Sequence, residues 1–259
     1  PSTAAIPSAP AVTKSEIKIS KKYDMYGYIE HIPLKGIRKT IADHLVNANL
    51  SAAYVSAMDD ADITSLYQHR EQQKENAKAK GVHLTYMPFI TKAIISALKE
   101  HPMVNSAIDE ENGEIIVKKY YNIGIAVATE AGLIVPVIKG ADAKNILELG
   151  KEIQELADKA KTRKIDLSDL KGGTFSVTNY GSIGGLYATP IPNYPDIAIL
   201  GIGRMYDGAV VKSGTVQIRK ILPLSFTFDH RVIDGAEAAA FMNSVIKRLE
   251  DPDILLLGD

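Results

Sequence analysis

The chain has 259 residues, of which 46% are hydrophobic and 24% charged, a composition typical of a globular protein and unlike that of a collagen-like or mostly disordered chain. Thirty basic residues nearly balance 31 acidic ones, so no overall positive field favours nucleic acid or an anionic membrane as a partner. Because the chain has no cysteine, disulfides, thiolate metal sites and a cysteine nucleophile are excluded.

The sequence leads us to expect neither a membrane span nor a targeting signal. Its apolar stretches fall well short of the roughly 20 residues that cross a bilayer, and no basic segment followed by an apolar one resembles a signal peptide. We therefore expect a piece of a cytoplasmic protein. Residues 1–14 hold three prolines among Ala, Ser and Thr, which predicts an extended linker that joins the domain to something upstream.

Three helices and one strand are predicted in the first hundred residues. Each helix either shows apolar residues at helical spacing or is bounded by Gly or Pro, which stop helices. The helices are expected over about 36–50, 64–80 and 88–99, and the strand over 52–62. The first helix, with Ile37, Ile41 and Leu45 on one side, is expected to be amphipathic.

The middle of the chain changes to a β pattern. Nearly continuous β-branched residues over 121–129 and 133–138 are typical of strands buried on both faces, and the turn at 130–132 predicts a hairpin deep in the fold. A polar helix follows at about 145–162. Further strands are expected at Val117, 174–178, 197–202, Val210, 216–218 and 224–228, before a last helix at about 235–250. Without a regular βαβ repeat, this order indicates an α+β domain with a mixed sheet covered by helices.

Histidine is the usual general base near neutral pH, and the chain has six. No two of them share a metal-binding spacing beside a carboxylate, so no metal is expected. His230 differs from the others because it follows a predicted strand and precedes the last helix. A side chain at such a strand end is held firmly and remains reachable.

The residues after His230 also admit a purely structural interpretation. Asp234 is a suitable N-cap for the last helix, and Glu237 three residues later completes a capping box. The structural and catalytic interpretations are compatible, because a cap also fixes the loop that carries the imidazole.

A second candidate is Thr178, at the end of a predicted strand and before the Gly-rich stretch 181–185. A hydroxyl in this place can donate a hydrogen bond to an oxyanion, although Thr in a strand and Gly in a turn are also ordinary structural choices. The stretch Gly201-Ile202-Gly203 is not a dinucleotide-binding motif, because Tyr206 stands where the third glycine would be needed.

The run from Ser225 to Ala236 resembles the DHRxxDG active-site motif of the dihydrolipoamide acyltransferases, the core components of 2-oxo acid dehydrogenase complexes. Four further segments agree with that family in the same order, and together the matches cover about residues 30–259. These segments are 37–42, 84–97, 122–139 and 173–201. The resemblance divides the chain into a linker and N-terminal arm, residues 1–30, and an acyltransferase catalytic domain, residues 31–259.

The resemblance implies a chloramphenicol-acetyltransferase-like fold that works as a trimer with active sites in channels between subunits. Coenzyme A would enter one end of a channel, and a dihydrolipoyl group, carried on a lipoyl domain absent from this chain, would enter the other. Trimers would assemble into a core of 24 or 60 subunits. The 2-oxo acid decarboxylase and dihydrolipoamide dehydrogenase components would bind through further domains that this chain lacks.

The resemblance also implies roles for individual residues. His230 would be the general base that takes the proton of the attacking thiol, and Asp234 would support its loop. Thr178 would stabilise the tetrahedral oxyanion, and in one site His230 and Thr178 would come from neighbouring chains. Three residues are expected to bind substrate: Asn179, Gly235 and Arg38. Two partners are considered for Arg38: a coenzyme A phosphate, for which Lys39 is an equal candidate, and Asp234. Against both stands the ordinary interpretation that charges on an exposed helix are only solvated.

One segment departs from the family pattern. Many relatives carry a Pro-His pair after the first helix, where this chain has Ala52-Ala53-Tyr54, a difference that bears on the acyl pocket or the lipoyl side. Two alternatives to the acyltransferase remain: a self-assembling scaffold, suggested by the apolar stretch 254–257, and a stand-alone acetyltransferase of small molecules. Spacing does not specify whether the acyl group is acetyl, succinyl or branched.

Overall fold

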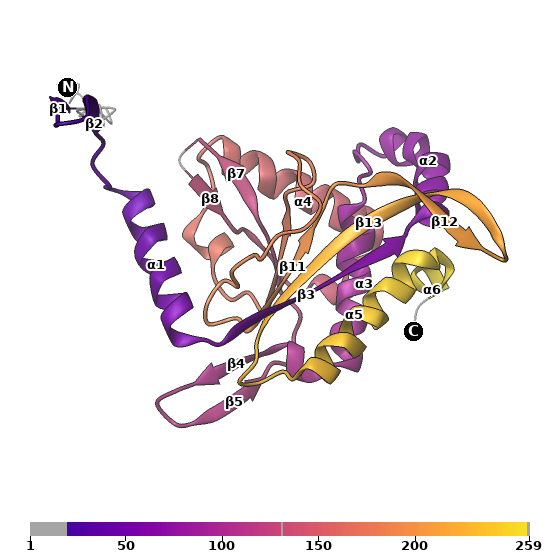
Figure 1. Ribbon diagram of the computed structural model, residues 1–259. Helices are drawn as coiled ribbons and strands as arrows, with labels where there is room; N and C mark the ends of the chain where they lie inside the picture. Colours follow the sequence, from indigo (N-terminus) through magenta and orange to yellow (C-terminus); the bar gives the residue numbers. More distant parts are fainter. Residues whose placement is uncertain (1–19, 131, 258–259) are drawn as a thin grey trace, which may run out of the picture.

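One long strand, β13 (Thr215–Asp229), organises the central sheet of the protein, seen in a computed structural model that describes residues 20–130 and 132–257 (Figure 1). One edge of β13 pairs with β3 (Tyr54–Asp62), and the other pairs first with β12 (Tyr206–Lys212) and then with β11 (Ala198–Ile202). The predicted linker, residues 1–14, lies outside the described residues.

Beyond β11 the sheet continues through β10 (Phe175–Asn179), β6 (Ile123–Ile125) and β9 (Val137–Ile138). The pairs β11–β10 and β10–β6 are parallel, and the other pairs of this sheet are antiparallel. The mixed sheet expected from the order of elements is therefore confirmed. The separate strands predicted over 216–218 and 224–228 are wrong, because both belong to β13.

The two faces of the sheet differ in chemistry. On β13, Phe226 and Phe228 face helix α5 (Gly235–Glu250), and the ring of Phe226 lies 4.7 Å from that of Phe241. The alternating residues Ser225 and Thr227, buried as well, face the other way. One face is thus an aromatic and aliphatic core, whereas the opposite face is lined by small polar side chains.

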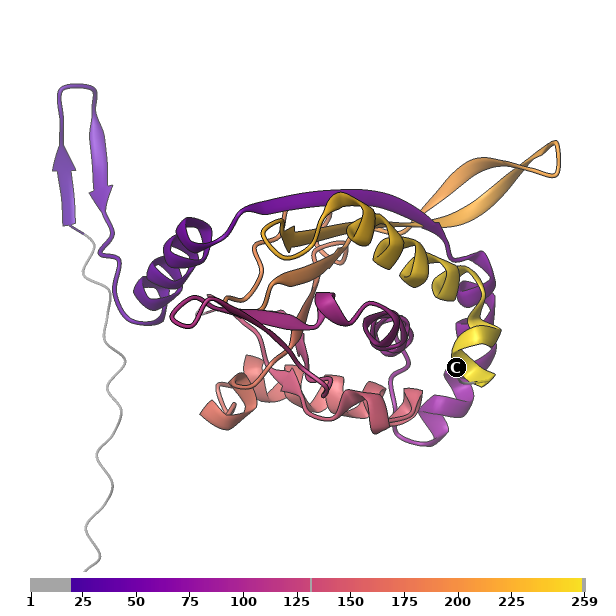
Figure 2. The same ribbon diagram turned by 90° about the horizontal axis from the view of Figure 1, so that it is seen from below.

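Helix α3 (Met87–Glu100) fills the space behind the aromatic face. Ten of its 14 residues are buried, because it is enclosed between α5 and α4 (Ile146–Lys161), as Figure 2 shows. α2 (Thr64–Ala79) follows the C-terminal end of β3. All four helices agree with the predicted ranges to within one or two residues.

The hairpin predicted over 121–138 forms, but only its inner half lies deep in the fold. β6 and β9 are buried within the large sheet. The outer half, β7 (Val127–Thr129) and β8 (Gly132–Ile134), pairs as a separate two-stranded sheet in which Ala128 and Leu133 are exposed. The expectation of burial on both faces is therefore wrong for the outer half.

Two elements reach away from the body. Helix α1 (Ile37–Ser51) has Ala48 as its one fully buried residue, so its apolar side chains are largely exposed in the single chain. Before it, β1 (Ser20–Tyr23) and β2 (Tyr28–His31) form a hairpin that the sequence did not predict. Both lie at one end of the molecule (Figures 1 and 2).

The remaining elements close the fold. β4 (Ser106–Asp109) and β5 (Glu114–Val117) form a second projecting hairpin. α6 (Pro252–Leu257) is a short helix that packs Leu255 against the core, where the sequence suggested an apolar tail. Three short 3-10 helices are η1 (Pro102–Val104), η2 (Ala141–Ala143) and η3 (Leu167–Leu170). Within residues 20–130 and 132–257, no helix combines the length and apolar character of a membrane span.

Candidate active site

The loop that carries His230 begins where β13 ends. The backbone N–H of His230 donates to the carbonyl of Ala53 at 2.9 Å, and the ring lies 5.9 Å from that of Phe228. The backbone N–H groups of Val232 and Ile233 both donate to the carbonyl of Asp229. The turn is therefore tight, and His230 sits at its exposed apex.

The residues on either side of His230 are bound to each other. The carboxylate of Asp229, which is 2% exposed, accepts from the backbone N–H of Arg231 and from its Nε and Nη2. The Nη1 of Arg231 donates to Glu110 Oε1 at 3.0 Å. The hydrogen bonds to Asp229, with a further one to Glu110, raise the pKa of the Arg231 guanidinium above its usual value. The Asp229–Arg231 ion pair thus holds the two sides of the turn together.

Asp234 caps helix α5 as predicted, since its side chain accepts from the backbone N–H of Glu237 at 2.9 Å. The predicted capping box is wrong in its second half. Instead of reaching back to Asp234, the Glu237 side chain lies 3.1 Å from Nδ1 of His101, at the end of α3. The His101 contact competes for this carboxylate and ties α5 to α3.

Tyr54, in the segment that departs from the family pattern, lies directly opposite Asp229 across the β3–β13 pair. The backbone of the neighbouring Ala53 binds two residues of the turn. Its N–H donates to Asp229 Oδ1, and its carbonyl accepts from the backbone N–H of His230. Burial raises the pKa of the Tyr54 hydroxyl to about 12, and the Asp229 carboxylate adds to this. The hydroxyl is buried and has no hydrogen-bond partner among the described residues. The departure therefore touches the His230 loop directly.

Thr178 lies near the end of β10, half-buried, on the face of the sheet lined by small polar side chains. Alternation along the strand turns Asn179 to the opposite face. There its amide Nδ2 lies 3.8 Å from Met87 Sδ, and its Oδ1 accepts from the backbone N–H of Ser182. The structure thus separates two residues that the sequence analysis placed in one site.

Close packing holds the glycine-rich loop after Thr178. A Cβ atom at Gly181 would lie 2.1 Å from the carbonyl oxygen of Gly203, and one at Gly203 would lie 2.0 Å from that of Leu186. These backbone approaches exclude any side chain at either position. Gly181 also donates its N–H to Ile202, and Arg204 donates to Gly185. The glycines therefore allow the loop backbone to pack closely against the end of β11.

The ring of Tyr180 covers Gly201 on the same face. A Cβ at Gly201 would lie 2.8 Å from this ring, and the Tyr180 hydroxyl is 3.0 Å from Ser225 Oγ. Ser225 Oγ also accepts from the backbone N–H of Ala188 at 3.2 Å. A buried serine thus anchors both ends of the loop that follows Thr178.

Within one chain, His230 and Thr178 do not meet. Thr178 pairs with Gly201 and Gly201 with Ser225, so Thr178 lies two strands away from β13 and level with Ser225. Strands lie about 4.8 Å apart and rise about 3.3 Å per residue, which places His230 roughly 19 Å from Thr178. A site that uses both side chains needs a second copy of the chain.

The two other predicted binding residues lie apart as well. Gly235 is the exposed first residue of α5, next to the cap. Arg38 is exposed in the first turn of α1, at the far end of the molecule from α5 (Figure 1). No ion pair joins Arg38 to Asp234 in the described part of the chain.

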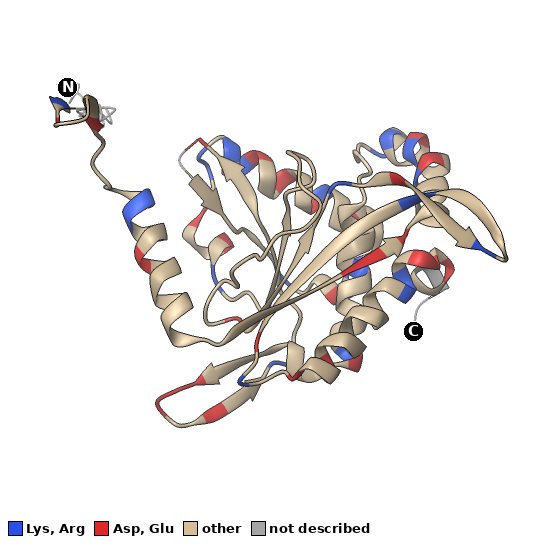
Figure 3. Ribbon diagram, in the orientation of Figure 1, with Lys and Arg blue, Asp and Glu red and all other residues tan. Residues whose placement is uncertain are grey.

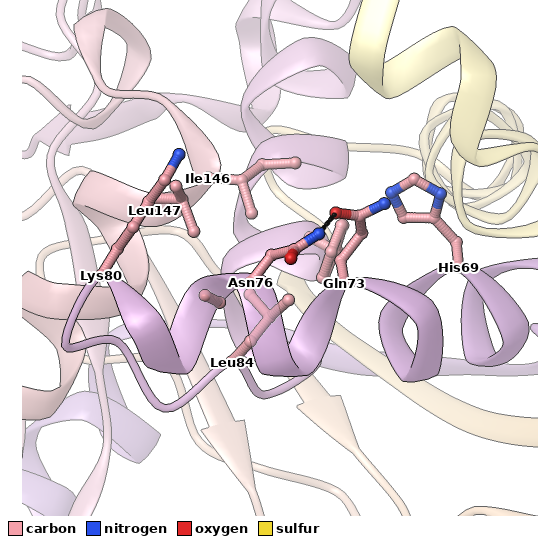
Figure 4. A pocket seen from close by; sticks show the side chains of 9 residues that line it. His69, Gln73, Asn76, Lys80, Leu84, Ile146 and Leu147 are labelled. Carbon is pink, nitrogen blue, oxygen red and sulfur yellow. Dashed lines mark hydrogen bonds between the residues drawn. The ribbon is translucent and has the colours of Figure 1, made fainter.

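A hollow of about 320 Å³ lies elsewhere, between α2 and the start of α4 (Figure 4). Leu84, Ile146 and Leu147 form apolar walls, and Gln73 and Asn76 of α2 line one side. Neither His230 nor Thr178 contributes to it. In the part of the chain that the structure describes, no three His, Asp or Glu side chains gather into a metal site.

A family model described as 2-oxoacid dehydrogenases acyltransferase (catalytic domain) matches residues 27–257. The chain belongs to this family. The resemblance stated from the motifs is therefore confirmed over almost all of the described residues, including both loops.

Relatives and solved structures agree with the family. The acetyltransferase component of the pyruvate dehydrogenase complex of Bacillus subtilis is 46% identical over 86% of this chain and 51% of that protein. A structure of Azotobacter vinelandii dihydrolipoamide acetyltransferase matches with a TM-score of 0.87 and 38% identity, over 97% of this chain and 100% of that one. The cubic core of a pyruvate dehydrogenase complex gives the same TM-score at 39% identity and the same coverage.

Chloramphenicol acetyltransferase shares the fold of this acyltransferase domain, with a TM-score of 0.51 and 16% identity over 80% of this chain and 94% of that one. The predicted fold class is thus confirmed. The chain spans about half the length of the curated relatives it matches.

Sequence reasoning missed Glu110, Ala53 and Ser225, which hold the two loops. Glu110 lies 121 residues before its partner Arg231, so no local pattern links the two. The alternation of small polar with large apolar residues along 224–229 was the one signal that could have drawn attention to Ser225.

Proposed function

We propose that this chain is an acyltransferase domain that moves an acyl group between a dihydrolipoyl group and coenzyme A. The observation that carries the proposal is the His230 loop, whose exposed imidazole stands on a backbone fixed by Ala53 and by the Asp229–Arg231 pair. Family membership supports the reaction class.

The spacing of three residues supports the roles that we propose. The study of the Azotobacter enzyme concerns a serine, a histidine and an asparagine in its catalytic mechanism. Their separations along that chain equal those between Thr178, His230 and Asp234 here. We assign Thr178 to the oxyanion, His230 to proton transfer and Asp234 to support of the loop through its cap on α5.

The proposed reaction begins with proton transfer. A thiol with a pKa near ~8.5 is largely protonated at neutral pH, and the neutral His230 imidazole takes its proton. The thiolate then attacks the thioester carbonyl of the other substrate, and the hydroxyl of Thr178 donates a hydrogen bond to the resulting oxyanion. Collapse expels the second sulfur as a thiolate, which recovers the proton from the imidazolium. The acyl group passes directly between two sulfurs, which is consistent with a chain that has no cysteine to acylate.

In this proposal each site combines His230 of one chain with Thr178 of another, which fits their separation of roughly 19 Å within a chain. We propose a trimer as the unit that closes such sites. The exposed α1 and the β1–β2 hairpin offer surface for these contacts. Trimers would build a core of 24 or 60 chains, and the match to a cubic core favours 24.

The substrates and partners follow from the relatives. Acetyl is the acyl group that we propose, because the matching proteins are named acetyltransferase components of the pyruvate dehydrogenase complex. The lipoyl group would arrive on a lipoyl domain, and the decarboxylase and dihydrolipoamide dehydrogenase components would be the protein partners. Gly235, Asn179 and Arg38 stay predictions for substrate contacts, and so does a cytoplasmic location.

Replacement of His230 tests the proposal. His230→Ala should lower the rate of acetyl transfer from acetyl-coenzyme A to free dihydrolipoamide about 10²–10⁴-fold. The mass of the particle by light scattering should not change, because the side chain is exposed. His83→Ala, at another exposed histidine, is the matched control and should keep full activity. Near-normal turnover by His230→Ala would refute the assignment.

A further inference from the structure

Two residues that flank His230, Asp229 and Arg231, bind each other and hold the turn together. Asp229 accepts from the backbone N–H of Arg231 at 3.0 Å and from its Nη2 at 2.7 Å. The guanidinium has a further edge, and this edge is taken by Glu110 from a distant part of the chain, with Nη1 to Oε1 at 3.0 Å. The planar fork of arginine is suited to bridging two carboxylates in this way.

Glu110 lies in the turn of the β4–β5 hairpin, whose tip also contains Asp109 and Glu111 and appears as an acidic end in Figure 3. The contact crosses from this hairpin to the loop after β13. It thus links the tip of the hairpin to the residue that follows His230.

The base of this hairpin is fixed firmly. Lys118, just after β5, donates from Nζ to Asp196 Oδ1 at 3.2 Å and to the carbonyl of Gly173 at 3.1 Å. Asp196 is 4% exposed and also forms a β-bridge with Ala107 of β4. The amide of Asn105 donates to the carbonyls of Lys118 and Tyr120. The hairpin that carries Glu110 is therefore anchored at its base.

An ordinary surface ion pair contributes little to stability, because solvent screens it. The side chains of Arg231 and Glu110 are 38% and 46% exposed, so stability alone gives this contact small weight. Its position is what matters, because Arg231 follows His230 directly and its other edge is locked to the buried Asp229. A shift of the guanidinium moves the backbone on which the imidazole stands.

We propose that Glu110 is a positioning residue for His230: by holding Arg231 against Asp229 it fixes the loop, and it adds one negative charge to the Asp229–Arg231 pair. The inference rests on the proposed function, since it assumes that His230 transfers the proton. In that reaction the imidazole becomes a cation, which a nearby negative charge stabilises. The charges of Asp229 and Arg231 cancel, so Glu110 gives the cluster one net negative charge, which favours the step.

The substitutions at Glu110 leave the other charged or titratable groups near the loop unchanged. They come from β3, from the segment before β11, from the residue after β5 and from the cap of α5: Tyr54, Tyr194, Asp196, Lys118 and Asp234. None of them contacts Glu110 within the described residues.

The test compares Glu110→Gln with Glu111→Gln in the assembled protein. Glu111 is the exposed neighbour in the same turn, and its side chain forms no ion pair within the described ranges. Glu110→Gln should lower kcat about 10-fold, because a displaced base loses alignment, and should leave KM for both substrates unchanged. The acid limb of the pH–rate profile should move to lower pH, since a negative charge is lost from the loop. Glu111→Gln should match the unsubstituted protein in all three measurements.

Arg231→Lys provides the second arm. If Glu110 acts through Arg231, Glu110→Gln in the Arg231→Lys background should cause less than a 2-fold further loss. An equal 10-fold loss in that background would overturn the inference, and so would a Glu110→Gln protein that matches Glu111→Gln.

His230→Ala separates the two failures. An active His230→Ala protein sinks the proposed function and this inference with it. An inactive His230→Ala protein beside a fully active Glu110→Gln protein sinks the inference alone.

Discussion

Charge holds the loop after β13, whereas shape holds the loop after β10. Around His230, two carboxylates grip one guanidinium, and the apex stays exposed. After Thr178, glycines allow backbone atoms to pack directly against each other. The hydroxyl of Ser225 binds the Tyr180 hydroxyl and the backbone N–H of Ala188. Both loops follow strands of the same sheet, so the sheet itself does not dictate how a loop is held.

The difference matters for the chemistry proposed for each loop. A side chain that gains charge during a reaction profits from fixed charges nearby, and these are found beside His230. A hydroxyl that donates one hydrogen bond needs only a fixed direction, which close packing supplies at Thr178. The two loops should therefore respond to different substitutions. A change of charge should disturb the His230 loop, and a change of side-chain volume should disturb the loop after Thr178.

The largest effect is expected from Gly181→Ala. Its new Cβ would meet the backbone oxygen of Gly203 at 2.1 Å, and backbone atoms cannot move aside as a flexible side chain can. The free energy of unfolding should fall by about 3 kcal/mol or more, measured by urea denaturation followed by circular dichroism. Gly235→Ala, where the same atom meets nothing within 4 Å, is the control and should change stability little. A Gly181→Ala protein of normal stability would show that shape does not hold this loop.

A smaller effect is expected from Asp229→Asn, which keeps the volume and removes the charge. Arg231 would then retain one carboxylate partner, Glu110. Breaking a fully buried pair costs about 3–5 kcal/mol, but Arg231 is partly exposed, so we expect a loss of about 2 kcal/mol. Denaturation in low and in high salt measures it. If the loss were absent in both, charge would not be what secures the His230 turn.

The smallest effect is expected from Tyr54→Phe, which removes a hydroxyl buried beside Asp229 and Arg231. Because this hydroxyl has no partner within the described residues, its removal relieves the cost of keeping a polar group from water. The melting temperature should stay the same or rise, by the equivalent of up to about 1 kcal/mol. A clear fall on calorimetry would reveal a hydrogen-bond partner, such as an ordered water, that makes Tyr54 part of the charge-held loop.

Local patterns predicted the parts of this molecule that local physics decides. The last helix begins at Gly235 and ends at Glu250, as its cap and its apolar spacing indicate. The strand predicted over 174–178 matches β10 (Phe175–Asn179) for the same reason. His230 was recognised by its place between a strand and a helix and by its motif.

Pairings between distant segments decided the rest. β13 was predicted as two strands, over 216–218 and 224–228, but it runs without a break through Pro223, although proline is disfavoured in a strand interior. In the structure Pro223 lies where β13 changes its neighbour from β12 to β11, and its carbonyl accepts from Gly203 at 2.8 Å. The contact of Glu237 with His101 likewise depends on how α5 lies against α3. Such features follow from the assembled fold and leave no mark at the level of neighbouring residues.

The distance between His230 and Thr178 within a chain has a consequence for regulation. In the proposed arrangement a dissociated chain would hold two unmatched half-sites, however well each loop were folded. Turnover per chain should then fall when the protein is diluted below the concentration at which its chains assemble.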